Sequence, residues 1–305
     1  MKKRILVTGG AGFIGSHIVD AYVERGYRVV VIDNLSTGFR KNLNPKAKFY
    51  KADTRNAKKI NEIFQKERPD VVNHHAAVSE VARSLRNPKL TFDVNITGTE
   101  NVLLASGIYH AKNFIFPSSG GTVYGDPKEI PTDESIPLDP LSPYAFSKAV
   151  NEQYIKFYAH RFGFKYLILR YANVYGPRQN PKGEAGVIAI FGGLIGEGRR
   201  PTIFGDGTKT RDYIHISDVV RANILGLTRG KNEILNLGFG KEITDQNVFD
   251  AVAKSMGFKG KPIYAPFRKG ENRRIALKNA RAKRVLKWDP KTGFQDGVRS
   301  TLTSL

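Results

Sequence analysis

The chain has 305 residues, 40% of them hydrophobic, with no cysteine and a formal net charge of +21. This length predicts one large and one smaller domain, the charge favours an anionic partner, and the missing cysteines exclude disulfides and cysteine metal sites. No apolar run reaches the ~18 residues of a membrane span, and the N-terminus lacks the apolar region and cleavage site of a signal peptide, so we expect a soluble, cytoplasmic protein without a membrane partner.

The first half of the chain alternates short apolar runs with amphipathic stretches. The apolar runs predict strands at 4–9, 28–33, 48–53, 70–76, 113–119 and 165–171. The stretches between them predict helices at 12–26, 56–67, 88–110 and 143–163. Such alternation indicates right-handed crossovers and an α/β fold, in which a doubly wound parallel sheet has helices on both faces.

The character of the sequence changes after Tyr171. Residues 173–211 are rich in Gly, Pro, Asn and charge, whereas a helix at 216–230, a strand at 233–239 and a helix capped by Thr244 follow. We expect one domain over 1–172 and a smaller α/β domain over 173–305. The smaller domain is expected to be discontinuous, because helix 217–229 and strand 233–239 would pack back on the first domain.

A basic stretch near the C-terminus accounts for part of the charge. Residues 268–287 carry nine Lys or Arg residues and one acidic residue. We interpret the stretch as a solvated helix face and expect no specific nucleic-acid partner, since no recognition motif accompanies it. A nucleotide- or nucleic-acid-binding protein without catalysis is the non-enzymatic alternative.

Three glycines follow the first predicted strand and open the first helix. Gly9 permits a tight turn, Gly12 lets the backbone approach a diphosphate, and Gly15 lets the helix pack against the sheet. In this position the spacing indicates a Rossmann-type dinucleotide site. Asp33 ends the second strand, where a carboxylate accepts hydrogen bonds from the adenosine ribose and repels a 2′-phosphate. Because Asn34 and not an arginine follows it, the sequence favours NAD over NADP.

The histidines do not suggest a metal site. His74 and His75 are neighbours on a predicted strand, where adjacent side chains point to opposite faces. Packing or hydrogen bonding therefore explains them better than a shared metal ion, and we predict that the protein binds no metal.

Tyr144 and Lys148 form the candidate catalytic pair. They lie four residues apart near the start of a predicted helix, on one helical face. An ammonium group nearby favours the phenolate, so we expect Lys148 to lower the pKa of Tyr144 from ~10 toward neutral pH. Tyr144 could then remove a proton from a sugar hydroxyl while the attached carbon loses hydride.

Many further motifs make the chain resemble the extended short-chain dehydrogenase/reductases and, within them, the UDP-glucose 4-epimerases. The resemblance covers nearly the whole chain. It rests on TGGAGFIGSH (8–17), DNLSTG (33–38), HHAA (74–77), NITGTENVL (95–103), SSGGTVYG (118–125), PYAFSK (143–148), RYANVYGPRQ (170–179), GDGTKTRDYIHISDVV (205–220) and RKGE (268–271).

The resemblance implies a cofactor site and a sugar-nucleotide site, residue by residue. NAD would contact Gly9, Gly12, Phe13, Ile14, Gly15, Asp33, Asn34, Ser36, Gly38, Asp53, Thr54, Ala76, Ala77, Val78, Asn95, Ser118, Tyr144 and Lys148. A UDP-sugar would contact Thr122, Asn173, Val187, Phe204, Arg211, Arg268 and Glu271. Thr54 departs from the hydrophobic residue that often occupies its position in the family.

One departure affects the catalytic site. Many epimerases of this family have Ser or Thr four residues before the Tyr of the VYG motif, and this chain has Gly120 there. The hydroxyl that assists Tyr144 must then come from Ser119, Ser118 or Thr122, and we favour Ser119. The alternative is that the serines only satisfy backbone groups at the strand end.

The same segment selects the reaction. Sister dehydratases and decarboxylases carry a carboxylate just before VYG, whereas this chain has Gly120, Gly121 and Thr122. We therefore predict an NAD-dependent 4-epimerase, an isomerase that interconverts UDP-glucose and UDP-galactose by oxidation at carbon 4 and return of hydride to the opposite face. UDP-N-acetylglucosamine or UDP-glucuronate are alternative substrates. The family pattern also implies a homodimer formed by helices 88–110 and 143–163.

Overall fold

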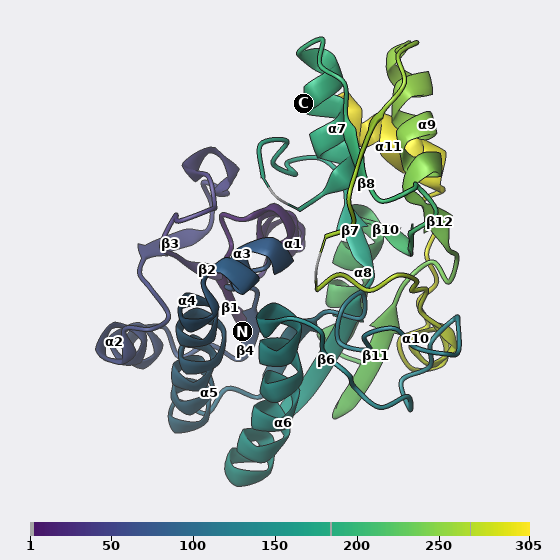
Figure 1. The fold of residues 1–305 in the computed structure, drawn as a ribbon. Helices are drawn as coiled ribbons and strands as arrows, with labels where there is room; N and C mark the ends of the chain where they lie inside the picture. The colour runs from purple at the N-terminus through teal and green to yellow at the C-terminus, as the bar shows by residue number, and fades with distance from the viewer. Residues whose placement is uncertain (1–2, 184, 269) are drawn as a thin grey trace.

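A seven-stranded parallel sheet forms the centre of the computed structural model, which describes residues 3–183, 185–268 and 270–305. The strand order is β11-β6-β5-β4-β1-β2-β3 (Figure 1). The strands are β1 (Arg4–Thr8), β2 (Arg28–Asp33), β3 (Lys48–Lys51), β4 (Val71–His74), β5 (Asn113–Ser118), β6 (Lys165–Tyr171) and β11 (Glu233–Leu237). Because β1 lies between β2 and β4, the order reverses there, which is where such sheets bind ligands. The predicted Rossmann-type α/β fold is confirmed.

Helices cover both faces of the sheet, and for this reason strands such as β1 and β2 are nearly continuous apolar runs. One face is covered by α1 (Phe13–Glu24) and α8 (Ile216–Gly226), and the other by α2 (Ala57–Glu67), α5 (Gly98–Ile108) and α6 (Pro143–Phe162). Side chains of β1 alternate between the two cores. Ile5 and Val7 join the cluster that includes α1 and α8, and Leu6 joins the cluster that includes α2, α5 and α6.

Helix α6 begins and ends at the residues that the sequence predicts. Ser142 is its N-cap and accepts a 3.2 Å hydrogen bond from the Ala145 N–H, a contact that stabilises a helix by ~1 kcal/mol. The helix ends at Gly163, whose φ of 79° favours glycine. Because the cap at Ser142 sets where α6 begins, it also sets the positions of Tyr144 and Lys148 in the first turns of the helix, near the end of β5.

A second group of elements lies beside the sheet, in the upper right of Figure 1. Its helices are α7 (Val187–Gly196), α9 (Asp245–Met256) and α11 (Phe294–Leu302), which share a third cluster of buried apolar side chains. Three two-stranded sheets accompany them: β7 (Asn173–Tyr175) with β10 (Tyr213–His215), β8 (Thr202–Phe204) with β13 (Ile263–Ala265), and β9 (Thr210–Arg211) with β12 (Ile243–Thr244). Helix α10 (Ala280–Leu286) packs near β11 and α8.

The helix predicted over 88–110 is interrupted. The structure has α3 (Val81–Arg86), α4 (Pro88–Phe92), a π-helical turn η2 (Asp93–Thr97) and then α5. Single π turns often occur at functional sites, and this one carries Asn95. A short 3-10 turn, η1 (Arg40–Asn42), follows β2. None of the described helices is both long enough and apolar enough to cross a membrane.

Candidate active site

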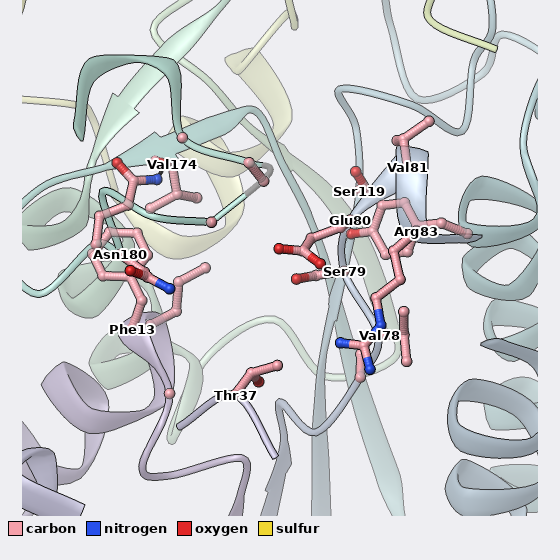
Figure 2. Close-up of a pocket in the computed structure, with 18 of the residues that line it drawn as sticks. Phe13, Thr37, Val78, Ser79, Glu80, Val81, Arg83, Ser119, Val174 and Asn180 are labelled. Carbon is pink, nitrogen blue, oxygen red and sulfur yellow. Dashed lines mark hydrogen bonds between the residues drawn. The ribbon is translucent and has the colours of Figure 1, made fainter. Parts of the chain in front are cut away.

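A cavity of about 1050 Å³ lies at the carboxyl ends of β1, β2, β4 and β5 and continues to the second group of elements. Figure 2 shows Phe13 and Asn180 on one side of it and Glu80 and Ser119 on the other. The predicted site residues that line it are Gly9, Gly12, Phe13, Ile14, Gly15, Asp33, Asn34, Ser36, Gly38, Asp53, Thr54, Ala76, Ala77, Val78, Ser118, Ser119, Thr122, Tyr144, Lys148, Asn173, Val187, Phe204, Arg211, Arg268 and Glu271.

The glycine loop leaves room for a diphosphate beside the first helix. Gly9 has a φ of +67°, and a Cβ there would lie 2.7 Å from the backbone nitrogen of Ala76. Gly12 is the N-cap of α1, and no side chain caps that helix. The N–H groups of its first turn are therefore available to an anion, which the positive end of the helix also attracts.

Asp33 lines the cavity at the end of β2, and the loop holds its carboxylate in place. Its Oδ2 accepts a hydrogen bond from the Ala11 N–H at 3.0 Å, and its Oδ1 accepts one from the Leu35 N–H at 2.8 Å. A carboxylate has about four acceptor positions, so it can also accept hydrogen bonds from ribose hydroxyls.

Asp53, the predicted adenine contact, is paired with two other side chains. Arg55 donates to it in a bidentate contact at 3.0 and 2.8 Å, and Asn34 donates to it at 2.9 Å. These hydrogen bonds, that of Arg55 above all, hold the pKa of Asp53 well below its usual range. Because Arg55 is engaged in this way, it is not presented as a ligand for a 2′-phosphate, which agrees with a preference for NAD.

Asn95 lies behind the cavity wall and is absent from its lining, unlike the other predicted cofactor residues. Its amide exchanges hydrogen bonds with the backbone of Val78, at 2.7 Å from the N–H and 3.0 Å to the carbonyl, and donates to Ser147 Oγ at 2.9 Å. The side chain thus ties the loop after β4 to helix α6. The family resemblance implied a place along the cofactor, whereas in the structure Asn95 is buried behind the cavity lining.

The two histidines have separate environments, as their positions on a strand predict. His74 hydrogen-bonds Thr8 through Nδ1 at 2.7 Å and Thr99 through Nε2 at 2.9 Å, and burial lowers its pKa to about 3. His75 stacks on Tyr171, and its Nε2 is buried without a hydrogen-bond partner. In the part of the chain that the structure describes, no three or more His, Asp or Glu side chains are grouped to hold a metal ion.

Tyr144 and Lys148 both line the cavity, but they are not in direct contact through their polar atoms. Lys148 Nζ donates a 2.7 Å hydrogen bond to the carbonyl of Pro117 and lies 5.9 Å from the Tyr144 ring centroid. Burial lowers the pKa of Lys148 to about 7. Burial also raises the pKa of Tyr144, and a side-chain hydrogen bond with Ser119 acts in the opposite direction. The expectation that Lys148 lowers the pKa of Tyr144 toward neutral pH is therefore wrong for this arrangement, in which burial raises that pKa.

The two adjacent serines at the end of β5 have different partners. Ser118 donates a 2.7 Å hydrogen bond to Glu152, a fully buried carboxylate that pairs with Arg170 at 2.9 and 2.6 Å. Ser119 lies beside Tyr144, whose pKa it acts to lower, and accepts a 2.9 Å hydrogen bond from Thr122 Oγ1. Ser118 is thus part of a buried ion pair, whereas Ser119 and Thr122 form a hydroxyl chain that leads to the tyrosine.

Gly120 leaves no room for the hydroxyl-bearing side chain that related epimerases have there. A Cβ at this position would lie 2.5 Å from Cδ1 of Leu277 and 3.1 Å from the carbonyl oxygen of Arg170. Leu277 is fully buried, so it has little space into which to move. Gly121 is also tight, because a Cβ there would lie 2.9 Å from Oδ1 of Asn173.

The far end of the cavity is rich in charge. The Arg268 guanidinium stacks on the Phe204 ring at 3.6 Å from the centroid, and Arg211 lies buried on β9. Glu271 lies within 4.0 Å of both arginines. Val187 opens helix α7 at the same end. An apolar ring beside paired guanidinium groups suits a planar base attached to a diphosphate.

Several lining residues were not identified from the sequence. Lys209 and Asp245 meet at the charged end of the cavity, with 3.2 Å between Nζ and Oδ2. Glu80 and Arg83 line it after β4. Lys209 could have been identified from the sequence, because it lies two residues before the predicted substrate contact Arg211. Asp245 gave none, because its place depends on pairing between distant strands.

The chain matches the model of the NAD dependent epimerase/dehydratase family over residues 5–238. The chain belongs to this family. A relative from Methanocaldococcus jannaschii is 48% identical over 295 residues, covering 97% of this chain and 96% of that protein. The UDP-glucose 4-epimerase of Mycolicibacterium smegmatis is 39% identical over 305 residues, covering 98% of this chain and 97% of that enzyme.

Solved structures of this epimerase/dehydratase family superimpose closely. The UDP-glucose 4-epimerase of Thermotoga maritima, determined with UDP-glucose, is 45% identical with a TM-score of 0.97 and covers 99% of this chain and 98% of its own. That of Thermus thermophilus, determined with NAD, is 41% identical with a TM-score of 0.94, with the same coverage. The predictions of the family, of an NAD-dependent epimerase and of NAD as its cofactor are confirmed. The uncapped first turn of α1 and the tight glycine loop fit that cofactor.

Proposed function

We propose that this family member is a 4-epimerase that interconverts UDP-glucose and UDP-galactose. The observation that carries the proposal is the surroundings of Tyr144. Tyr144 and Ser119 line the cavity side by side, and the adjoining positions Gly120, Gly121 and Thr122 provide no carboxylate. The chain's similarity to enzymes determined with UDP-glucose and with NAD supports the same substrate and cofactor.

Tyr144 would move the proton of the reaction. Its phenolic oxygen accepts the proton of the C4 hydroxyl as the carbon–hydrogen bond at C4 breaks, and it returns that proton in the reverse step. Bound NAD supplies the acceptor of the hydride and a positive charge beside the tyrosine. Ser119 would hold the phenolic oxygen in place, with Thr122 behind it. Lys148, anchored on the Pro117 carbonyl, would present its remaining N–H donors toward the cofactor ribose.

Return of hydride, and not loss of water, is expected after oxidation. Elimination from the 4-keto sugar needs a general acid and a general base near carbons 5 and 6. Residues 120–122, where the sister dehydratases carry their carboxylates, provide neither group. Asp33 and Asp53 line the adenosine end of the cavity, and Asp245 and Glu271 line the charged end. Glu80 is the cavity carboxylate that would have to take such a role.

The test is incubation of the purified protein with UDP-glucose without added NAD, followed by separation of the products. We expect UDP-galactose with bound NAD unchanged at the end. Formation of a 4-keto-6-deoxy sugar would overturn the proposal and assign an acid–base role to Glu80. UDP-N-acetylglucosamine and UDP-glucuronate belong in the same experiment, because a related structure is a UDP-N-acetylglucosamine 4-epimerase from Methanobrevibacter ruminantium, 34% identical with a TM-score of 0.93.

A homodimer is part of the proposal. Helices α5 and α6 carry large apolar side chains that are exposed in the single chain, namely Ile108, Phe146 and Phe157, which are 51%, 49% and 58% accessible. Apolar side chains gathered on two neighbouring helices favour burial against a second copy.

The domain division and the compartment also remain predictions. We assign residues 1–172, together with α8 and β11, to NAD binding, and most of 173–305 to the sugar nucleotide. Pairing of β11 with β6 supports this division. The cytoplasmic location rests on the sequence alone.

A further inference from the structure

The charged end of the cavity contains three cations and two carboxylates in a chain of contacts. Lys209, Arg211 and Arg268 are the cations, and Asp245 and Glu271 are the carboxylates. All five line the cavity. With every group ionised the cluster carries a net charge of one positive unit, and without Lys209 it would be neutral. Loss of Lys209 would therefore remove the net positive charge that attracts a diphosphate to this end of the cavity.

The contacts within the cluster are unequal. Lys209 Nζ lies 2.7 Å from Oε2 of Glu271, whereas Arg211 and Arg268 lie 3.9 and 4.0 Å from its carboxylate oxygens. Only the lysine contact is a hydrogen bond in length. Lys209 is thus the hydrogen-bond partner of the Glu271 carboxylate. Neither guanidinium forms the bidentate pair with Glu271 that arginine and carboxylate prefer.

Lys209 is itself fixed by the backbone. Strands β9 and β12 pair antiparallel, Thr210 with Thr244, and the Asp245 N–H donates a 3.0 Å hydrogen bond to the Lys209 carbonyl. This pairing sets Asp245 beside the lysine, with Oδ2 3.2 Å from Nζ. The lysine side chain is only 12% exposed, so it is held between two carboxylates and cannot swing freely into solvent.

We propose that Lys209 is a positioning residue of the nucleotide site, one that holds Glu271 and Asp245 and so keeps Arg211 and Arg268 available for the substrate diphosphate. The inference rests on the proposed function, since it assumes a nucleoside diphosphate at this end of the cavity. Without the lysine, Glu271 would pair with one or both arginines, and the guanidinium groups would be withdrawn from the substrate.

The experiment measures the dissociation constant of UDP by calorimetry, so that it does not depend on turnover. The Lys209→Gln variant should bind UDP at least about tenfold more weakly, and Lys209→Arg should recover most of the loss. Binding of NAD, whose proposed ribose site is at Asp33, should be unchanged. A charge-matched control is Lys231→Gln, on the exposed turn before β11, which should leave the UDP affinity unchanged. Thermal unfolding of each variant checks the fold.

A double variant separates positioning from direct phosphate binding. If Lys209 acts by holding Glu271, the Lys209→Gln change should cost little in a Glu271→Gln background, because the carboxylate that lies within 4.0 Å of both arginines is then absent. Equal losses in the two backgrounds would overturn the inference. So would an unchanged UDP affinity for Lys209→Gln. Either result would leave the proposed epimerase activity untouched, because that activity is measured on the wild-type protein. A wild-type protein that does not bind UDP would overturn both proposals.

Discussion

The hydroxyl of Ser118 donates a 2.7 Å hydrogen bond to the carboxylate of Glu152, one helical turn beyond Lys148. The neighbouring hydroxyl, that of Ser119, instead faces Tyr144. Two adjacent residues of identical chemistry, the last of β5 and the one after it, thus have different partners.

This difference predicts opposite consequences for two alanine substitutions. Ser119→Ala should lower kcat by about tenfold or more with little change in the melting temperature, since it removes a partner of the proton-transfer group. Ser118→Ala should lower the free energy of unfolding by ~1–3 kcal/mol, because a buried carboxylate loses a hydrogen-bond donor. Epimerase kinetics and thermal unfolding of both variants check the assignment. A larger loss of kcat for Ser118→Ala than for Ser119→Ala would contradict it.

Removal of the phenolic hydroxyl should abolish most of the activity. We expect Tyr144→Phe to lower kcat by ~10²–10⁴-fold, the usual contribution of a positioned acid–base group. The fold and NAD content should persist, since the glycine loop is held by backbone hydrogen bonds from Gly9 to Ile32 and from Gly12 to Gly9. Steady-state assays, with absorbance of the released cofactor as the control, measure this. Turnover within a factor of two of wild type would exclude Tyr144 as the base.

The buried ion pair beneath the site should be important for stability. Glu152→Gln would leave the Arg170 guanidinium without its charged partner, and loss of one member of a buried pair typically costs ~3–5 kcal/mol. Both side chains are almost fully buried, at 0% and 4% exposure. Urea unfolding should show the loss. The exposed pair Lys59 and Glu62 is a matched control, and Glu62→Gln should change stability by less than ~1 kcal/mol.

His74 should make the folded state sensitive to acid. Its pKa of about 3 in the folded protein is below the ordinary value of 6.5, so between these values the unfolded chain binds more protons. Its contribution to stability is therefore complete above pH 6.5 and is lost as the pH falls toward 3, by up to ~1.4 kcal/mol per pH unit. Replacing His74 with Gln should flatten the dependence of the unfolding free energy on pH in that window. An unchanged slope would contradict the burial of a neutral imidazole.

An acidic side chain on the proposed dimer surface should separate the subunits. Phe157→Asp on α6 places a charge on the most exposed of the large apolar side chains there, and burying it against a second copy would be costly. Light scattering after size exclusion should show a dimer for the wild type and a monomer for the variant. Phe39, 43% exposed on the loop after β2, provides the control Phe39→Asp, which should remain dimeric. A monomeric wild type would refute the proposal directly.

Much of the central sheet could be predicted from the sequence, because each buried strand is a short apolar run with clear ends. The strand over Arg28–Asp33 and the cap at Thr244 agree with the structure residue for residue. The short strands β8, β9, β12 and β13 were not predicted. Strands of two or three residues carry no periodicity, and their pairing depends on residues far apart in the chain.

The candidate site shows the same limit. Residues that belong to local motifs, such as Gly9 and Tyr144, lie where the motifs predict. The contact between Lys209 and Asp245 depends on the pairing of β9 with β12, and the position of Asn95 depends on a π turn. The tyrosine pKa could not be predicted from spacing alone, because Lys148 Nζ binds the Pro117 carbonyl instead of approaching the phenol.

The tight contact between Gly120 and Leu277 constrains how this enzyme could have diverged from its relatives. A serine at position 120 requires space that Leu277 occupies, so the first substitution alone should lower the free energy of unfolding by about 1–3 kcal/mol. The two positions should therefore change together along lineages, with a smaller side chain opposite any hydroxyl-bearing residue at 120. An assisting hydroxyl at position 120 and one at position 119 would then belong to different lineages, because a change from one to the other needs two substitutions.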